Sequence, residues 1–196
     1  MTTSTTVTSQ PLNNNMTGDL PILVSEMTSF CHLYLDNNYL SGSIPVEYGR
    51  FPFLQYLVVS GNKLTGAIPP KIRNLSTLQQ LYIGYYNTFS SNIHSEIGNL
   101  SQLVQFNGAS CRLSDSIPAE ISKLRNLDTL FLQVNAFARA LTTELGYLKS
   151  LKSIDLSNNM FSSEILASFA QLKKLTIFNL FRNKLHGLIP EFTGNL

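Results

Sequence analysis

The stretch Leu54-Gln-Tyr-Leu-Val-Val-Ser-Gly-Asn-Lys-Leu-Thr-Gly-Ala-Ile-Pro69 decides the fold of this 196-residue chain. Its pattern, Leu-x-x-Leu-x-Leu-x-x-Asn-x-Leu-x-Gly-x-Ile-Pro with Val59 at the third leucine position, returns about every 24 residues. A partial copy ends at Pro21, and full copies then open at Phe30, Leu54, Leu78, Leu103, Leu127, Leu151 and Leu175. Self-similarity at this period predicts a solenoid in which each unit buries its apolar face against its neighbours.

The apolar alternation inside each copy predicts a short strand. In the copy that opens at Phe30, Leu33 and Leu35 alternate with polar residues. A period of two places the leucines inward and the intervening residues outward. We therefore expect an α/β leucine-rich-repeat solenoid of about 7.5 plant-type repeats over residues 11–196, a right-handed superhelix whose concave face is one parallel sheet.

Polar and special residues mark the corners of each copy. The side chain of an asparagine at the corner is expected to bond backbone groups of neighbouring coils, since each unpaired buried amide costs about 1 to 3 kcal/mol. Cys111 takes this corner position once. Glycine at positions 18, 42, 66 and 187 suits the next turn, and proline after isoleucine suits a non-helical return path. The corner asparagines are Asn38, Asn62, Asn87, Asn135, Asn159 and Asn183.

Three copies depart further from the pattern. One extra residue in Gly84-Tyr85-Tyr86 predicts a bulge or a wider turn. Elsewhere Ala138-Arg139-Ala140-Leu141-Thr142 replaces Ser-Gly-x-Ile-Pro, Ser163 and Leu166 replace glycine and proline, and His94 replaces proline. These residues lie on the return side, so we expect looser turns and an intact strand face.

Composition excludes several classes of protein. The chain is 43% hydrophobic and 13% charged with a net charge of +2, which gives no basic footprint for nucleic acid. Cys31 and Cys111 lie more than three repeats apart, or roughly 15 Å in a regular stack, so we predict two free thiols. No stretch approaches the roughly 18 apolar residues that a membrane span needs.

The two ends of the chain differ from its middle. Residues 1–10 form a Ser/Thr-rich segment without the features of a signal peptide, which we predict to be disordered. The solenoid of residues 11–196 shows no polar capping repeat at either end. We expect a fragment of a longer protein that, isolated, frays at its ends or aggregates through open sheet edges.

The phrases Leu40-Ser-Gly-Ser-Ile-Pro45, Leu64-Thr-Gly-Ala-Ile-Pro69 and Leu185-His-Gly-Leu-Ile-Pro190 resemble the plant-type repeats of receptor-like kinase ectodomains. Leu127-Asp-Thr-Leu-Phe-Leu-Gln-Val-Asn135 and Asn179-Leu-Phe-Arg-Asn-Lys-Leu-His-Gly187 resemble more narrowly the middle repeats of the CLAVATA/BARELY ANY MERISTEM receptors. The resemblance implies a segment on the outer side of the plasma membrane that binds a short secreted CLE-type peptide, with co-receptor leucine-rich-repeat kinases as possible partners. The Ser/Thr kinase and the membrane span of such receptors are absent from this chain.

The outward strand positions predict where a ligand would bind. One row reads Tyr34, Val58, Tyr82, Asn107, Phe131, Asp155 and Phe181, with large rings in four coils of seven. Rigid rings among polar groups are typical anchors of recognition surfaces, although such rings also pack across strands for stability alone. Seven coils span roughly 35 Å, which fits an extended peptide of about 10 to 12 residues.

The predicted ligand-binding set combines these rings with nearby polar side chains. Arg182 is either a partner for a ligand carboxylate or a solvated surface cation. In the resembled receptors, a pair of arginines in later repeats reads the carboxyl end of the peptide, and this chain has no Arg-x-Arg. The full set is Tyr34, Tyr82, Tyr85, Phe131, Gln133, Asp155, Phe181 and Arg182.

Other sites and functions are predicted less directly. The sequons at Asn15, Asn74 and Asn99 are candidate glycosylation sites. His32, His94 and His186 fall in different phases of the repeat, and no cofactor, metal or catalytic motif is found, so we expect no enzyme. Two alternatives remain open: a soluble interaction module, such as a secreted inhibitor of cell-wall-degrading enzymes, and a truncated gene product without activity.

Overall fold

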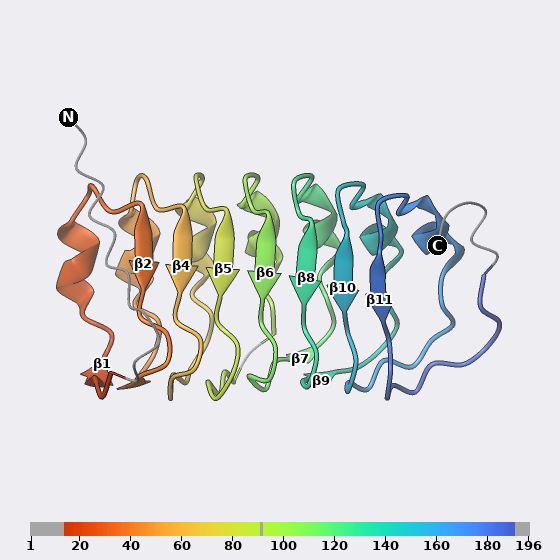
Figure 1. Ribbon diagram of the computed structural model, residues 1–196, viewed down its shortest axis with the longest axis horizontal. Coiled ribbons are helices and arrows are strands. Elements are labelled where there is room, and N and C mark those ends of the chain that lie inside the picture. Colours follow the sequence, from red (N-terminus) through yellow and green to blue (C-terminus); the bar gives the residue numbers. More distant parts are fainter. Residues whose placement is uncertain (1–13, 91, 191–196) are drawn as a thin grey trace.

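The computed structural model describes residues 14–90 and 92–190, and its coils follow one another in a single row. Figure 1 shows the strands side by side along one side of the row and the helical turns behind them. The segment 1–10 that we predict to be disordered lies outside the described residues.

The main sheet contains seven short parallel strands whose order in space follows their order in the sequence. Each strand has three residues and pairs in register with the strand of the next coil, for example Leu57 with Leu81. The strands are β2 (His32–Tyr34), β4 (Tyr56–Val58), β5 (Gln80–Tyr82), β6 (Gln105–Asn107), β8 (Thr129–Phe131), β10 (Ser153–Asp155) and β11 (Ile177–Asn179). The predicted parallel sheet is confirmed.

The middle residue of each strand points into the core. These residues are 5% exposed or less in the first six strands, and Phe178 packs against the same cluster in the seventh. The leucines that open each copy from Leu54 to Leu151 are fully buried beside them. One continuous hydrophobic core therefore runs along the row, as stacked repeats require. The six buried middle residues are Leu33, Leu57, Leu81, Phe106, Leu130 and Ile154.

The return path is helical, and the prediction of a non-helical return is wrong. In the described part of the chain, seven return paths turn into a five-residue 3₁₀ helix after the Ile-Pro position or its substitute. Pro45, Pro69 and Pro118 stand directly before three of these helices in extended conformation, so proline starts the helix and does not exclude it. The helices are η1 (Ile22–Glu26), η2 (Val46–Arg50), η3 (Pro70–Asn74), η4 (Ser95–Asn99), η5 (Ala119–Lys123), η6 (Thr143–Tyr147) and η7 (Ala167–Gln171).

Two small parallel sheets, which the pattern did not predict, form where the chain leaves the corner. β1 (Thr17–Asp19) pairs with β3 (Tyr39–Ser41), and β7 (Ser114–Asp115) pairs with β9 (Ala136–Phe137). They cover the Leu-x-Gly segment of four coils and lie along the lower edge of Figure 1.

The corner asparagines form the predicted ladder. The Nδ2 group of Asn62 donates to Val59 O at 3.1 Å in its own coil and to Leu35 O at 2.9 Å in the preceding coil. Its Oδ1 atom accepts from Leu40 N at 3.0 Å. Cys111 forms only part of this set. Its thiol donates to Gly108 O at 3.0 Å in its own coil, and its backbone carbonyl, in place of a side-chain oxygen, accepts from Phe89 N of the preceding coil at 3.0 Å.

Two copies that lack the turn glycine keep its left-handed backbone conformation. Asp115 and Arg139 stand where other copies have glycine, and their φ angles of 71° and 67° match the 75° of Gly66. Their side chains form an ion pair at 2.8 Å. The predicted bulge is confirmed at Tyr85 and Tyr86, which adopt left-handed φ angles of 57° and 62°.

Candidate functional site

The outward residues of the seven main strands form one surface, called here the sheet face. Strand register aligns its first row as His32, Tyr56, Gln80, Gln105, Thr129, Ser153 and Ile177. The second row is Tyr34, Val58, Tyr82, Asn107, Phe131, Asp155 and Asn179. Tyr34, Tyr82 and Phe131 are partly exposed on this face, outside the core.

One residue in the predicted aromatic row is misplaced. Asp155 pairs with Asn179, so Phe181 lies two residues beyond the last strand and outside the row. The second row therefore carries large rings in three coils of seven. In every other copy, the predicted row residue stands four positions after the opening residue. Phe181 stands six positions after Leu175, so the prediction chose the wrong residue in this copy.

The first two strands of the sheet face carry a cluster of aromatic rings. His32 stacks on Tyr56 of the next coil with ring centroids 4.2 Å apart and an interplanar angle of 8°. Tyr34 meets the edge of the same Tyr56 ring at 6.3 Å. Burial, with the nearby Tyr56 and Asp36, raises the pKa of the Tyr34 phenol. These rings do pack across strands, and they remain accessible at the surface as an apolar platform.

Tyr82 lies on β5, the third of the seven strands of the sheet face. Its hydroxyl donates a hydrogen bond to the side-chain carbonyl of Gln105 on the next strand. Burial raises the pKa of the Tyr82 phenol, and nearby Asp128, Tyr34 and Tyr56 raise it further. Tyr82 is thus a neutral, oriented ring on this face at physiological pH.

Polar side chains replace rings in the later coils. The Asp155 carboxylate accepts from Ser157 N at 2.9 Å and from Asn179 Nδ2 at 3.0 Å. Asn107 and Asn179 accept from the backbone two residues ahead in the same way, at 3.1 Å each. These residues close the strand end with local side-chain turns, a structural role that the sequence analysis missed although Asx turns follow from residue type.

The other predicted ligand-binding residues lie beyond the strand ends. Tyr85 is 43% exposed in the bulge. The Gln133 Oε1 atom is buried and accepts no hydrogen bond within the described part of the chain. Arg182 places its guanidinium carbon 5.2 Å from the centroid of the Phe181 ring, and both side chains are exposed. The structure thus separates the predicted set into a strand group and a turn group.

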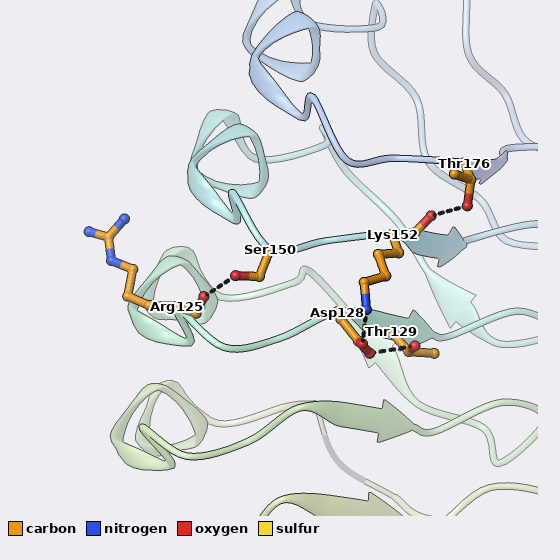
Figure 2. A network of polar contacts seen from close by, with 6 residues as sticks. All are labelled: Arg125, Asp128, Thr129, Ser150, Lys152 and Thr176. Carbon is orange, nitrogen blue, oxygen red and sulfur yellow. Dashed lines mark hydrogen bonds and ion pairs between the residues drawn. The ribbon is translucent and has the colours of Figure 1, made fainter. Parts of the chain in front are cut away.

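A polar network borders the strand starts of the later coils, and sequence reasoning did not identify it. The Lys152 ammonium lies 3.1 Å from the Asp128 carboxylate, which also accepts a hydrogen bond from Thr129 Oγ1 at 2.8 Å (Figure 2). Ser150 Oγ donates to Arg125 O at 2.8 Å between adjacent coils. These groups lie beside an open hollow of about 470 Å³ that includes Lys152 and Asp128 in its lining.

The predicted sequons and thiols have the following positions. Asn15, Asn74 and Asn99 are exposed, and Asn74 and Asn99 end η3 and η4 on the side of the coil away from the main strands. Cys31 and Cys111 are free thiols, as predicted. Burial raises the pKa of the Cys111 thiol to about 12.

The helical elements of residues 14–90 and 92–190 are five-residue 3₁₀ helices. These residues contain no group of three or more His, Cys, Asp or Glu side chains placed to hold a metal ion. In the same residues, no helix has the length and apolar character that crossing a bilayer demands.

Comparison with known proteins places the chain among repeat proteins. The family described as leucine-rich repeat region matches residues 22–196. The crystal structure of a TDR receptor matches with a TM-score of 0.90 and 40% sequence identity, covering 92% of this chain and 31% of that chain.

Two further solved structures are complexes of plant receptors. The plant peptide hormone receptor RGFR1 in complex with RGF2 matches with a TM-score of 0.89 and 32% identity over 91% of this chain and 28% of that chain. The ectodomain of the Arabidopsis thaliana membrane receptor kinase GASSHO1/SCHENGEN3, in complex with CASPARIAN STRIP INTEGRITY FACTOR 2, matches with a TM-score of 0.89 and 33% identity over 91% of this chain and 22% of that chain. This chain therefore spans less than a third of each of these three receptor chains.

Proposed function

Because this chain belongs to the leucine-rich-repeat family, we propose that it is a peptide-recognition segment of a plant receptor kinase ectodomain. Its ligand is a short secreted peptide of the CLE type, bound in extended form along the sheet face. The segment works on the outer side of the plasma membrane and performs no catalysis itself. A co-receptor leucine-rich-repeat kinase is a second partner that follows from the family resemblance.

The observation that carries this proposal is the outward placement of Tyr34, Tyr82 and Phe131 in one row of the sheet face. Rings that face outward from a rigid sheet bury much area on binding with little loss of conformational entropy. The likeness to the plant peptide hormone receptor RGFR1 in complex with RGF2, at 32% identity, supports a peptide as the ligand class.

The two ends of the sheet face offer different chemistry to such a peptide. The cluster of His32, Tyr34 and Tyr56 suits apolar side chains, whereas Asp155 and Asn179 offer hydrogen bonds. Since strands are spaced by about 4.8 Å, seven of them accommodate an extended peptide of about 10 to 12 residues. A peptide of that length would contact both ends at once.

Titration of the chain with synthetic CLE-type dodecapeptides tests the proposal. We expect the double variant Tyr82→Ala plus Phe131→Ala to bind at least about tenfold more weakly, because central aromatic anchors dominate such interfaces. The matched control is Phe53→Ala plus Tyr147→Ala, which removes two rings that are 58% and 44% exposed and belong to no strand of the main sheet. Equal affinity of the double variant and the wild type would reject the sheet face as the site.

A further inference from the structure

The turns that follow the main strands form a second exposed surface, called here the strand-end edge. It comprises residues 36–39, 60–63, 84–88, 109–112, 133–136, 157–160 and 181–184. In Figure 1 it lies along the lower edge of the row, beyond the tips of the strand arrows. It carries several large apolar side chains at the surface: Tyr39, Tyr85, Tyr86, Val134, Met160 and Phe181.

Tyr86 is the most exposed of these side chains, at 81%. It follows Tyr85 in the segment with the extra residue, and both tyrosines hold left-handed φ angles of 57° and 62°. Such angles are uncommon for bulky residues and occur where the surroundings fix them. The backbone of this turn is held by two hydrogen bonds: Tyr85 N donates to Ala109 O at 2.7 Å, and Tyr85 O accepts from Asn87 N at 2.8 Å.

Two hollows flank the Tyr86 ring. The hollow toward the amino-terminal coils has a volume of about 320 Å³, with Tyr39 and Lys63 in its lining. The hollow toward the carboxyl-terminal coils has a volume of about 580 Å³, with Arg112 and Val134 in its lining. Tyr86 borders both, so one exposed ring stands between two pockets that each combine an apolar and a cationic side chain.

The charge of the strand-end edge has one dominant sign. Its seven segments contain four cations, Lys63, Arg112, Arg182 and Lys184, against the single carboxylate of Asp36. That carboxylate accepts a hydrogen bond from Asn37 Nδ2 at 2.7 Å. The Lys63 ammonium lies 4.9 Å from the centroid of the Tyr39 ring, and Lys63 and Arg112 are both exposed.

We propose that the strand-end edge docks an acidic segment of a second protein, with the Tyr86 ring as the apolar anchor between carboxylates held by Lys63 and Arg112. Tyrosine and arginine are the residue types that dominate protein interfaces, and arginine binds carboxylates through two parallel hydrogen bonds. The net charge of the whole chain is only +2, so the positive character is local to this edge. That local pattern of rings and cations fits an acidic protein segment better than a long polyanion. The surface shares none of its strand positions with the sheet face, so this partner is additional to the proposed peptide.

Binding of a random glutamate–tyrosine copolymer to the immobilised 196-residue chain tests this proposal. We expect the copolymer to bind and a lysine–tyrosine copolymer of equal length not to bind. Tyr86→Ala should weaken binding about fivefold or more, while Tyr86→Phe should retain it because the ring is kept. Arg112→Ala should also weaken binding and flatten its dependence on salt.

The matched controls separate this surface from the rest of the molecule. Tyr147→Ala and Lys123→Ala remove an exposed ring and an exposed cation on the helical side, and they should leave copolymer binding within about twofold of wild type. The double variant Tyr82→Ala plus Phe131→Ala should also bind the copolymer normally, which separates this test from that of the sheet face.

The proposal is overturned if the glutamate–tyrosine copolymer does not bind, or if Tyr86→Ala and Tyr147→Ala bind it equally well. It is also overturned if a single-stranded oligonucleotide or phosphatidylserine vesicles bind as tightly with the same dependence on Tyr86, since the surface would then recognise polyanions in general.

Discussion

The inward and outward residues of the same strands differ in what they determine. Inward positions such as Leu57 and Phe106 are fully buried and apolar from coil to coil. Outward positions change from rings at His32 and Tyr56 to small polar groups at Ser153. The inward row fixes the stack, and the outward row fixes its surface chemistry. Substitutions in the inward row should therefore mainly lower stability, and substitutions in the outward row should mainly weaken binding.

The largest expected effect on stability is in the inward row. Phe106→Ala removes a fully buried ring between two coils and should lower the free energy of unfolding by about 3 to 5 kcal/mol. Phe53→Ala, which removes a ring that is 58% exposed, should change it by less than about 0.5 kcal/mol. Urea unfolding followed by circular dichroism measures both. Similar losses for the two variants would contradict the assignment of rows.

The corner ladder should have the next largest effect. Asn62→Ala deletes side-chain bonds to Leu35 O and Val59 O and leaves Leu40 N without its acceptor, so we expect a loss of about 2 to 3 kcal/mol. Cys111→Ala removes one thiol bond to Gly108 O and should cost about 1 kcal/mol. The same urea experiment compares the two variants. Equal losses of unfolding free energy would show that Cys111 stabilises its corner as much as an asparagine does.

The Cys111 thiol should make stability depend on pH. Burial raises its pKa to about 12 in the folded chain. As pH rises, the Cys111 thiol therefore loses its proton at a lower pH in the unfolded chain than in the folded chain. The contribution of the neutral thiol to stability is complete well below the unfolded pKa of about 8.5 and should fall by about 1 to 2 kcal/mol as pH rises from about 8 to about 10. The Cys111→Ala variant should lose most of this decrease, and the remainder comes from the Tyr48 phenol, whose pKa burial also raises. Iodoacetamide at pH 8 should label the half-buried Cys31 and spare Cys111 in the folded chain.

The outward row should contribute least to stability. Tyr56→Ala removes the ring that stacks on His32 at 4.2 Å and meets Tyr34, and it should cost only about 0.5 to 1.5 kcal/mol. Thermal unfolding measures this change. A loss as large as that of Phe106→Ala would mean that the aromatic cluster serves the stack, which would remove the case for it as a binding platform.

The fold was predictable because the inward row repeats. Leu33, Leu57 and Leu81 recur at one period, and the parallel sheet and the corner ladder follow from them with few alternatives. The return path was not predictable from Ile-Pro, since proline suits both an extended segment and the residue before a helix. The small sheets β1–β3 and β7–β9 depend on how closely neighbouring turns approach, which no single copy encodes.

The proposed binding surface was predictable only in part, because outward residues do not repeat. Tyr34, Tyr82 and Phe131 were placed correctly by counting from the opening residue of each copy, and Phe181 was not. The bonds that hold Asp155 within its own strand end depend on local geometry that residue counting does not supply. The exposure of Tyr86 follows from an insertion whose position was visible but whose conformation was not.

Hydroxyl-radical footprinting of the chain, with and without a bound CLE-type dodecapeptide, tests most directly whether the outward row is the binding surface. We predict strong protection of Tyr34, Tyr82 and Phe131, with unchanged oxidation of Phe53 and Tyr147. Protection confined to Phe53, Tyr147 or the strand-end edge, with the sheet-face rings oxidised as in the free chain, would contradict the account.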